Sequence, residues 1–231
     1  MSALVVQNTA RGGPGRVGAW LGAAGLGLRV LRPYAGEELP SVLGGRPLLV
    51  LGGGFLPDDD ARAPWLAATR RLVGQALADG TPMLGICLGG QLLAQVAGGT
   101  VRAAHGKPEY GSTRIRLRPE ALDDPLFSAL GGTVPAIERH VDAITRLPAD
   151  AVWLASSDDC PYQAFRVGSR AWGVQFHPEA EARDISAWDR ERLAAQGVDR
   201  DRLHARAMAD EPAAVAAWSV FTGRFAAVCG T

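Results

Sequence analysis

Cys87 ends an apolar run, lies between glycines and is followed at once by an apolar pattern of helical spacing. This order predicts a strand, a sharp turn and a helix with the thiol at the turn, which is the arrangement of a nucleophile elbow. Gly85 and Gly89 allow the backbone to turn tightly on either side. The thiol would stand at a helix N-terminus, where partial positive charge favours a reactive thiolate. We therefore predict a catalytic nucleophile, although a cysteine in an apolar strand is more often structural.

A histidine and a glutamate follow a second apolar run near the other end of the chain. Residues 171–176 predict a buried strand that delivers His177 to its end, Pro178 stops the strand, and Glu179 comes two residues after the histidine. Because residues i and i+2 of an extended chain face the same side, the carboxylate can orient the imidazole and stabilise its protonated form. Taken alone, His177 could be a satisfied histidine at a strand end. With Cys87, it completes a nucleophile, a base and an orienting acid.

The segments around these motifs predict how they are brought together. Strands without polar alternation, separated by helices, predict a parallel sheet covered on both faces, with a ligand crevice at the carboxyl ends of its strands. These strands are predicted at residues 3–7, 28–31, 48–51, 82–86 and 171–176, and the helices at 17–26, 64–78 and after Cys87. Shorter alternating strands are predicted at residues 101–104, 112–118, 133–137, 152–156 and 163–167.

The expected fold class is therefore α/β. We predict one domain over residues 1–231, with an open, mostly parallel, flavodoxin-like sheet, helices on both faces and a small antiparallel section. Residues 180–231 are predicted as a helical C-terminal extension, broken at Gly197 and Pro212.

The two motifs together resemble a known family. Residues 85–91 (GICLGGQ) and 173–179 (GVQFHPE), about 90 residues apart in this order, are similar to those of class I (triad) glutamine amidotransferases. Stand-alone proteins similar to the amidotransferase part of GMP synthase resemble the chain most. The resemblance covers most of the chain, from residue 4 to the C-terminal helices.

The resemblance implies roles for further residues. It implies a Cys87–His177–Glu179 triad and an oxyanion hole made by the backbone amides of Gly53 and Leu88. It also implies a substrate-binding set made of Gly54, Gln91, Arg139, His140, Val141 and Asp142. As purely structural alternatives, Gln91 could be a solvated helix residue, and His140 with Asp142 a polar loop.

The chain departs from the family's pattern at three places. Residues 104–111 (AHGKPEYG) form a segment that is longer and more polar than necessary. Gly54 stands where the oxyanion loop usually has proline, so the loop has more freedom than expected. Ala143 and Ile144 follow Asp142 where hydroxyl-bearing or aromatic residues are expected. These departures leave the triad intact and leave the identity of the substrate open.

Composition limits the other classes of function. The formal net charge is zero, with 24 basic and 24 acidic residues, which argues against a nucleic-acid or acidic-membrane partner. We identify no apolar stretch of about 20 residues and no signal peptide at the N-terminus. Three cysteines far apart do not predict a disulfide framework. We therefore expect a cytoplasmic protein.

Residues 13–18 fit G-x-G-x-x-G after the first strand, the pattern of a dinucleotide site. Five residues separate the strand from Gly13, Pro14 lies inside the motif, and Arg32 rather than an acid ends the second strand. An NADP site is therefore the weaker interpretation. His105 and His204 show no ligand spacing, and Cys160 and Cys229 have no charged or helix-start context, so the sequence predicts no metal and no cofactor.

Three functional hypotheses remain from the sequence. The first is hydrolysis of glutamine through a γ-glutamyl thioester, with ammonia passed to a partner synthetase in trans. The second is a partner-free hydrolase of γ-glutamyl amide or peptide bonds with the same triad. The third is a non-catalytic binding protein on this fold, which the intact triad argues against.

Overall fold

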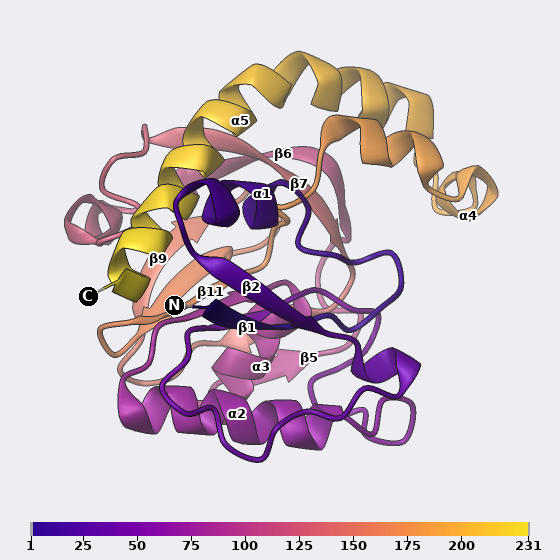
Figure 1. Ribbon diagram of the computed structural model, residues 1–231. Helices are drawn as coiled ribbons and strands as arrows, with labels where there is room; N and C mark the ends of the chain where they lie inside the picture. Colours follow the sequence, from indigo (N-terminus) through magenta and orange to yellow (C-terminus); the bar gives the residue numbers. More distant parts are fainter. Residues whose placement is uncertain (1, 231) are drawn as a thin grey trace.

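A nine-stranded sheet runs through the protein in the order β2-β1-β3-β4-β11-β10-β9-β6-β7 (Figure 1). The computed structural model describes residues 2–230. The strands of this sheet are β1 (Ser2–Val6), β2 (Gly27–Leu31), β3 (Leu48–Val50), β4 (Met83–Ile86), β6 (Glu109–Leu117), β7 (Thr133–His140), β9 (Val152–Ser156), β10 (Ala164–Val167) and β11 (Ala171–Val174). A separate pair is formed by β5 (Thr100–Arg102) and β8 (Ala143–Arg146).

The parallel half of the sheet positions the two sequence motifs. Strands β2, β1, β3, β4 and β11 pair in parallel, an order that matches the flavodoxin-like arrangement when β11 takes the fifth place. β3, β4 and β11 are buried along their whole length, as expected for strands covered on both faces. Ile86 pairs with Val174, so the segments after β4 and β11 leave the sheet side by side. Cys87 and His177 lie on these two segments.

Helices cover both faces of the sheet (Figure 1). Leu72 of α2 and Leu92 of α3 lie in one buried cluster, and Leu21 of α1 lies with Phe221 of α5 in the other. The helices are α1 (Gly15–Ala23), α2 (Leu66–Asp79), α3 (Leu88–Val96), α4 (Arg190–Ala194) and α5 (Arg200–Gly230). Short 3-10 turns are η1 (Pro33–Ala35), η2 (Pro119–Asp123) and η3 (Ala182–Ala187).

The predicted α/β fold is confirmed, and the antiparallel part is continuous with the parallel part. Strands β10, β9, β6 and β7 pair antiparallel beyond β11 and extend the same sheet. β7 runs to His140, three residues past its predicted end, and β8 was not predicted at all. Residues 143–146 are short and pair only with β5, so their strand depends on a tertiary contact.

The prediction that Pro212 breaks the C-terminal helix is wrong. α5 runs continuously through this proline, whereas Gly197, with φ 71°, does lie in the interruption before α5. An interior proline costs a helix about 3 kcal/mol or more. Burial of Ala207 before it and of Trp218 and Phe221 after it holds both halves against the sheet.

α5 also has the length and the apolar composition that a membrane span would need, over an 18-residue window of mean hydropathy 1.3. Within the fold it is a core helix. Trp218, Phe221 and Phe225 have no exposed surface, and Trp218 stacks against Phe176 beside the catalytic segment, with ring centroids 4.6 Å apart.

Candidate active site

The backbone at Cys87 has a conformation that few non-glycine residues adopt. Its φ is 52° and its ψ −108°, and it lies between β4 and α3. A Cβ at Gly85 would come within 2.3 Å of the Gly89 carbonyl oxygen, and one at Gly89 within 2.0 Å of the Val50 carbonyl oxygen. The Cys87 amide donates to Val174 at 2.8 Å, which holds the turn on β11. Strain of this kind costs roughly 1–3 kcal/mol and here aims the side chain out of the sheet.

His177 lies between the thiol and a carboxylate. Its backbone amide donates to the Ile137 carbonyl oxygen at 2.8 Å, and its Nδ1 lies 2.7 Å from Oε1 of Glu179. Because a carboxylate only accepts, Nδ1 carries the proton of this bond. Burial by itself would lower the pKa of His177, but the charges of Glu179 and Cys87, and hydrogen bonds to both, raise that pKa well above its ordinary value. The surroundings of His177 therefore favour its protonated, imidazolium form.

The glycine motif of residues 13–18 supports this triad. A Cβ at Gly15, where φ is 46°, would come within 2.2 Å of the Glu179 carbonyl oxygen, and the Arg16 amide donates to that oxygen at 3.1 Å. Arg16 Nε also donates to the Pro178 carbonyl oxygen at 2.9 Å, while its Nη1 is paired with Glu211 at 2.9 Å. The motif is thus packed against the segment that carries the acid. The sequence did not predict this role, because the glycine spacing indicated only a dinucleotide-binding site.

The predicted oxyanion loop, residues 50–54, lies against the nucleophile Cys87. A Cβ at Gly52 would come within 2.9 Å of His177 Cε1 and 3.5 Å of Cys87 Cβ, and one at Gly53 within 2.8 Å of the Leu88 side chain. The Leu88 amide is at the first position of α3, where N–H groups have no partner within the helix. Gly54 is exposed with nothing near its Cβ position. The structure therefore places Gly53 beside the Leu88 side chain, and the role of the two amides as oxyanion donors stays a prediction.

A chain of side-chain amides connects the thiol to the predicted substrate segment. Gln175 Nε2 donates to Cys87 Sγ at 3.6 Å, and Gln175 Oε1 accepts from Gln91 Nε2 at 3.1 Å. Gln91 Nε2 also donates to the Asp142 carbonyl oxygen at 3.2 Å. Gln91 is buried, so it is not a solvated helix residue. Gln175 was not predicted, although its place two residues before His177 puts it on the same side of the strand.

The four residues of the predicted substrate segment point in different directions. The His140 ring is buried and held at both nitrogens, whereas Val141 is 38% exposed. Asp142 accepts from the Ala104 amide at 2.9 Å. Arg139 lies on the opposite face of β7 from His140, and its guanidinium lies over the ring of Trp188, 4.9 Å from the centroid. Of the four, Asp142 is the one that the amide chain joins to the nucleophile.

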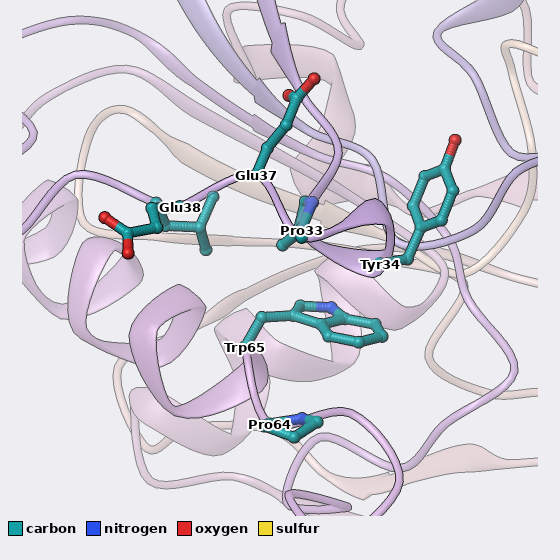
Figure 2. A pocket seen from close by; sticks show the side chains of 8 residues that line it. Pro33, Tyr34, Glu37, Glu38, Pro64 and Trp65 are labelled. Carbon is teal, nitrogen blue, oxygen red and sulfur yellow. The ribbon is translucent and has the colours of Figure 1, made fainter.

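An open pocket of about 550 Å³ lies next to the oxyanion loop (Figure 2). It is lined by Pro33, Tyr34, Gly36, Glu37, Glu38, Leu39, Pro64 and Trp65. Trp65 connects it to the site: its ring packs edge-on against Phe55 at 5.7 Å, and its Nε1 donates to Asn8 at 3.0 Å. Triad residues do not line this pocket, so it is a neighbour of the reaction centre and not its substrate cavity.

Known proteins resemble this chain in sequence and in fold. Residues 21–187 match the family model of glutamine amidotransferase class-I. The chain belongs to this family. It is therefore an enzyme of the glutamine amidotransferase class. A solved glutamine amidotransferase from Thermotoga maritima has the same fold, with a TM-score of 0.87 and 23% identity over 98% of both chains. One from Methylobacillus flagellatus has a TM-score of 0.80 and 25% identity, over 99% of this chain and 93% of that one.

This chain matches only part of the length of each of two relatives. The glutamine-hydrolysing GMP synthase of Porphyromonas gingivalis strain W83 is 37% identical over 147 residues, which is 63% of this chain and 27% of that protein. A protein of Sulfolobus acidocaldarius that is named as one subunit of a glutamine-hydrolysing GMP synthase is 44% identical over 101 residues, 43% of this chain and 52% of that protein. The chain thus spans about a quarter of one relative and half of the other.

Proposed function

We propose that this amidotransferase hydrolyses the side-chain amide of glutamine through a Cys87–His177–Glu179 triad and supplies ammonia to an acceptor on a partner enzyme. The observation that carries the proposal is the arrangement at the carboxyl ends of β4 and β11. There a strained cysteine, a histidine of raised pKa and a carboxylate 2.7 Å from that histidine follow one another. Family membership supports glutamine as the substrate.

The reaction proceeds in two steps. The Cys87 thiolate attacks the amide carbon, and the resulting oxyanion is bound by the Gly53 and Leu88 amides. The C–N bond then breaks, and His177 gives its proton to the departing ammonia. Water next attacks the γ-glutamyl thioester, His177 takes up the proton, and the C–S bond breaks to release glutamate and the thiolate. Losing one oxyanion donor typically costs about 3 kcal/mol of barrier.

Gln91, Gln175 and Asp142 hold the substrate side of the site in this scheme. The amide chain that joins them fixes the carbonyl of Asp142 relative to the sulfur. We assign glutamine binding to the space between Asp142 and Cys87, bordered by Gly54 and Val141. His140 holds the Asp142 carbonyl oxygen through its Nδ1, and the Arg139 guanidinium lies over the Trp188 ring.

The partner is inferred from the relatives. Proteins named GMP synthase carry the matching segment together with a longer remainder, and one relative is named as a separate GMP synthase subunit. This supports a synthetase in trans as the ammonia acceptor, and a pull-down with the intact chain tests for it. We also propose a cytoplasmic location, in keeping with three cysteines that are all free thiols.

The test combines labelling with turnover. A glutamine-like electrophile should modify Cys87, as located by mass spectrometry, and ammonia should be released from glutamine. Cys87→Ala should remove both while the circular-dichroism spectrum stays unchanged. Ammonia released only from γ-glutamyl peptides would replace glutamine by that substrate class and favour the partner-free hydrolase. An active Cys87→Ala protein, or a wild type that is neither labelled nor active, would contradict the proposal.

A further inference from the structure

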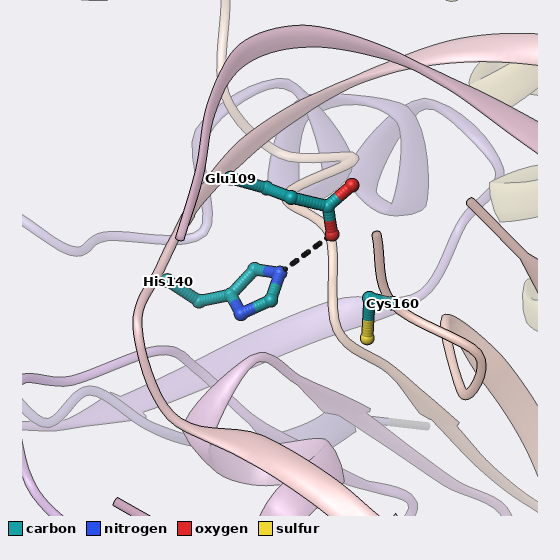
Figure 3. Close-up of side chains that lie close together, drawn as sticks. All are labelled: Glu109, His140 and Cys160. Carbon is teal, nitrogen blue, oxygen red and sulfur yellow. Dashed lines mark hydrogen bonds and ion pairs between the residues drawn. The ribbon is translucent and has the colours of Figure 1, made fainter. Parts of the chain in front are cut away.

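Beside the triad, four side chains with metal-ligating atoms converge from three segments. Glu109 comes from β6, Glu138 and His140 from β7, and Cys160 from the loop between β9 and β10. The ligand atoms of Glu109, His140 and Cys160 all lie within 4.8 Å of one another, and all three residues are buried (Figure 3). The proposed reaction uses none of these groups as acid, base or nucleophile.

The His140 ring presents one nitrogen to two carboxylates. Its Nδ1 lies 3.0 Å from the Asp142 carbonyl oxygen, which only accepts, so Nδ1 carries a proton. In the neutral ring Nε2 then has a lone pair, and it faces Oε2 of Glu109 at 3.0 Å and Oε2 of Glu138 at 3.5 Å. Acceptors that face one another need a cation between them, either a second proton or a metal ion.

Glu138 makes this requirement stronger. Its side chain has no exposed surface, and among residues 2–230 neither of its oxygens has a hydrogen-bond partner. A buried carboxylate is costly unless it is paired or binds a metal. Oε2 of Glu138 therefore faces His140 Nε2 at 3.5 Å without a hydrogen bond.

The two distances from His140 Nε2 to the carboxylates are compatible with ligands of one tetrahedral ion. Zinc bonds of 2.0–2.1 Å to nitrogen and oxygen place two such ligands about 3.3 Å apart, and a thiolate at 2.3 Å lies about 3.6 Å from them. The observed 3.0 and 3.5 Å fall on either side of the first value. The sulfur, within 4.8 Å of the other ligand atoms, would have to move by about 1 Å.

The surrounding hydrogen bonds are those expected around metal ligands. Such ligands are usually held by a second set of groups, a carbonyl on the far nitrogen of a histidine and a donor on a carboxylate. His140 has the Asp142 carbonyl in this position, and Glu109 accepts from Gln163 Nε2 at 2.7 Å. Gln163 is itself held by Ser157 at 3.1 Å.

We propose that Glu109, Glu138, His140 and Cys160 bind a divalent transition-metal ion of the zinc class. On binding, the thiol releases its proton to solvent and a sulfur–metal bond forms. The ion would link β6, β7 and the β9–β10 loop, and it would fix the His140 ring in its hydrogen bond to the Asp142 carbonyl oxygen. It would act as a structural ion and take no part in the bond-breaking steps. This site was not predicted from the sequence, where Cys160 had no charged or helix-start context.

The experiment loads the intact chain with Zn²⁺ or Co²⁺, in a Cys87→Ala background so that the catalytic thiol cannot contribute. We expect one equivalent of Zn²⁺ after buffer exchange, and with Co²⁺ the near-ultraviolet absorption of a thiolate–cobalt bond. Cys160→Ser should abolish that absorption and weaken binding at least tenfold. Cys229→Ser, at another buried cysteine, should change neither.

Several outcomes would overturn the site. The first is that the Cys87→Ala protein, in which Cys160 is intact, retains no metal and shows no thiolate–cobalt absorption. This measurement does not require that a ligand variant folds. Absorption that survives Cys160→Ser would place the metal elsewhere. A Zn²⁺ affinity that Glu138→Gln leaves unchanged would mean that Glu138 is not a ligand.

Discussion

Replacing Glu179 by glutamine tests how the carboxylate acts on His177. The substitution keeps the shape and one hydrogen-bond acceptor, and removes the charge 2.7 Å from Nδ1. At an effective dielectric of 20 the bare Coulomb energy at this separation is about 6 kcal/mol, which is an upper bound. A charge-assisted hydrogen bond contributes about 1.5–3 kcal/mol and a neutral one about 0.5–1.5 kcal/mol. The expected loss is therefore about 1–2 kcal/mol.

This loss converts into two observables. It lowers the pKa of His177 and slows the reaction by about 5–30-fold. His177 must be protonated to release ammonia, and its raised pKa keeps it so above its usual range. Activity should fall as the pH rises through that raised pKa. In Glu179→Gln this alkaline fall should begin at a lower pH than in the wild type.

The assay measures ammonia release and the rate of Cys87 labelling by a glutamine-like electrophile across a pH series. The labelling does not need a partner enzyme. Glu191→Gln, the same substitution at an exposed position on α4, is the matched control and should leave both profiles unchanged. If Glu179→Gln had the rate and the pH profile of the wild type, the carboxylate would not be acting on His177.

Three further outcomes are expected. Gly15→Ala should lower the free energy of unfolding by at least about 2 kcal/mol, or Tm by at least about 4 °C, because the new Cβ meets a carbonyl at φ 46°; the control Gly22→Ala, with nothing within 4 Å, should be neutral or stabilising. Burial raises the pKa of Cys229 to about 12, so iodoacetamide at pH 7 should label Cys87 and leave Cys229 unmodified. Mass spectrometry locates the label, and equal labelling of the two cysteines would refute the buried position of Cys229. Phe225→Ala removes a fully buried ring and should cost about 3–5 kcal/mol, a Tm loss of about 6–20 °C by calorimetry, whereas a loss under 1 °C would contradict its core position.

Much of the fold follows from the sequence because its signals are local. Unbroken apolar runs mark strands buried on both faces, and glycines two residues either side of Cys87 mark the sharp turn. These patterns predicted the parallel half of the sheet and the order of Cys87, His177 and Glu179. They could not predict β8 or the continuity of α5 through Pro212, because distant packing partners decide both.

The tertiary structure alone decided which polar groups meet. Gly15 and Arg16 belong with Glu179, more than 160 residues later in the chain, because α1 begins beside the end of β11. Gln175 joins Gln91, and Glu138 faces His140 and Glu109, only because β4, β11, β6 and β7 bring distant segments together. Hydrogen bonds and burial depend on distances in space. The spacing of residues along the sequence reflects them only where the contacting residues are neighbours in the chain. Thus the sequence alone pointed to a reactive cysteine, and the fold determined what surrounds it.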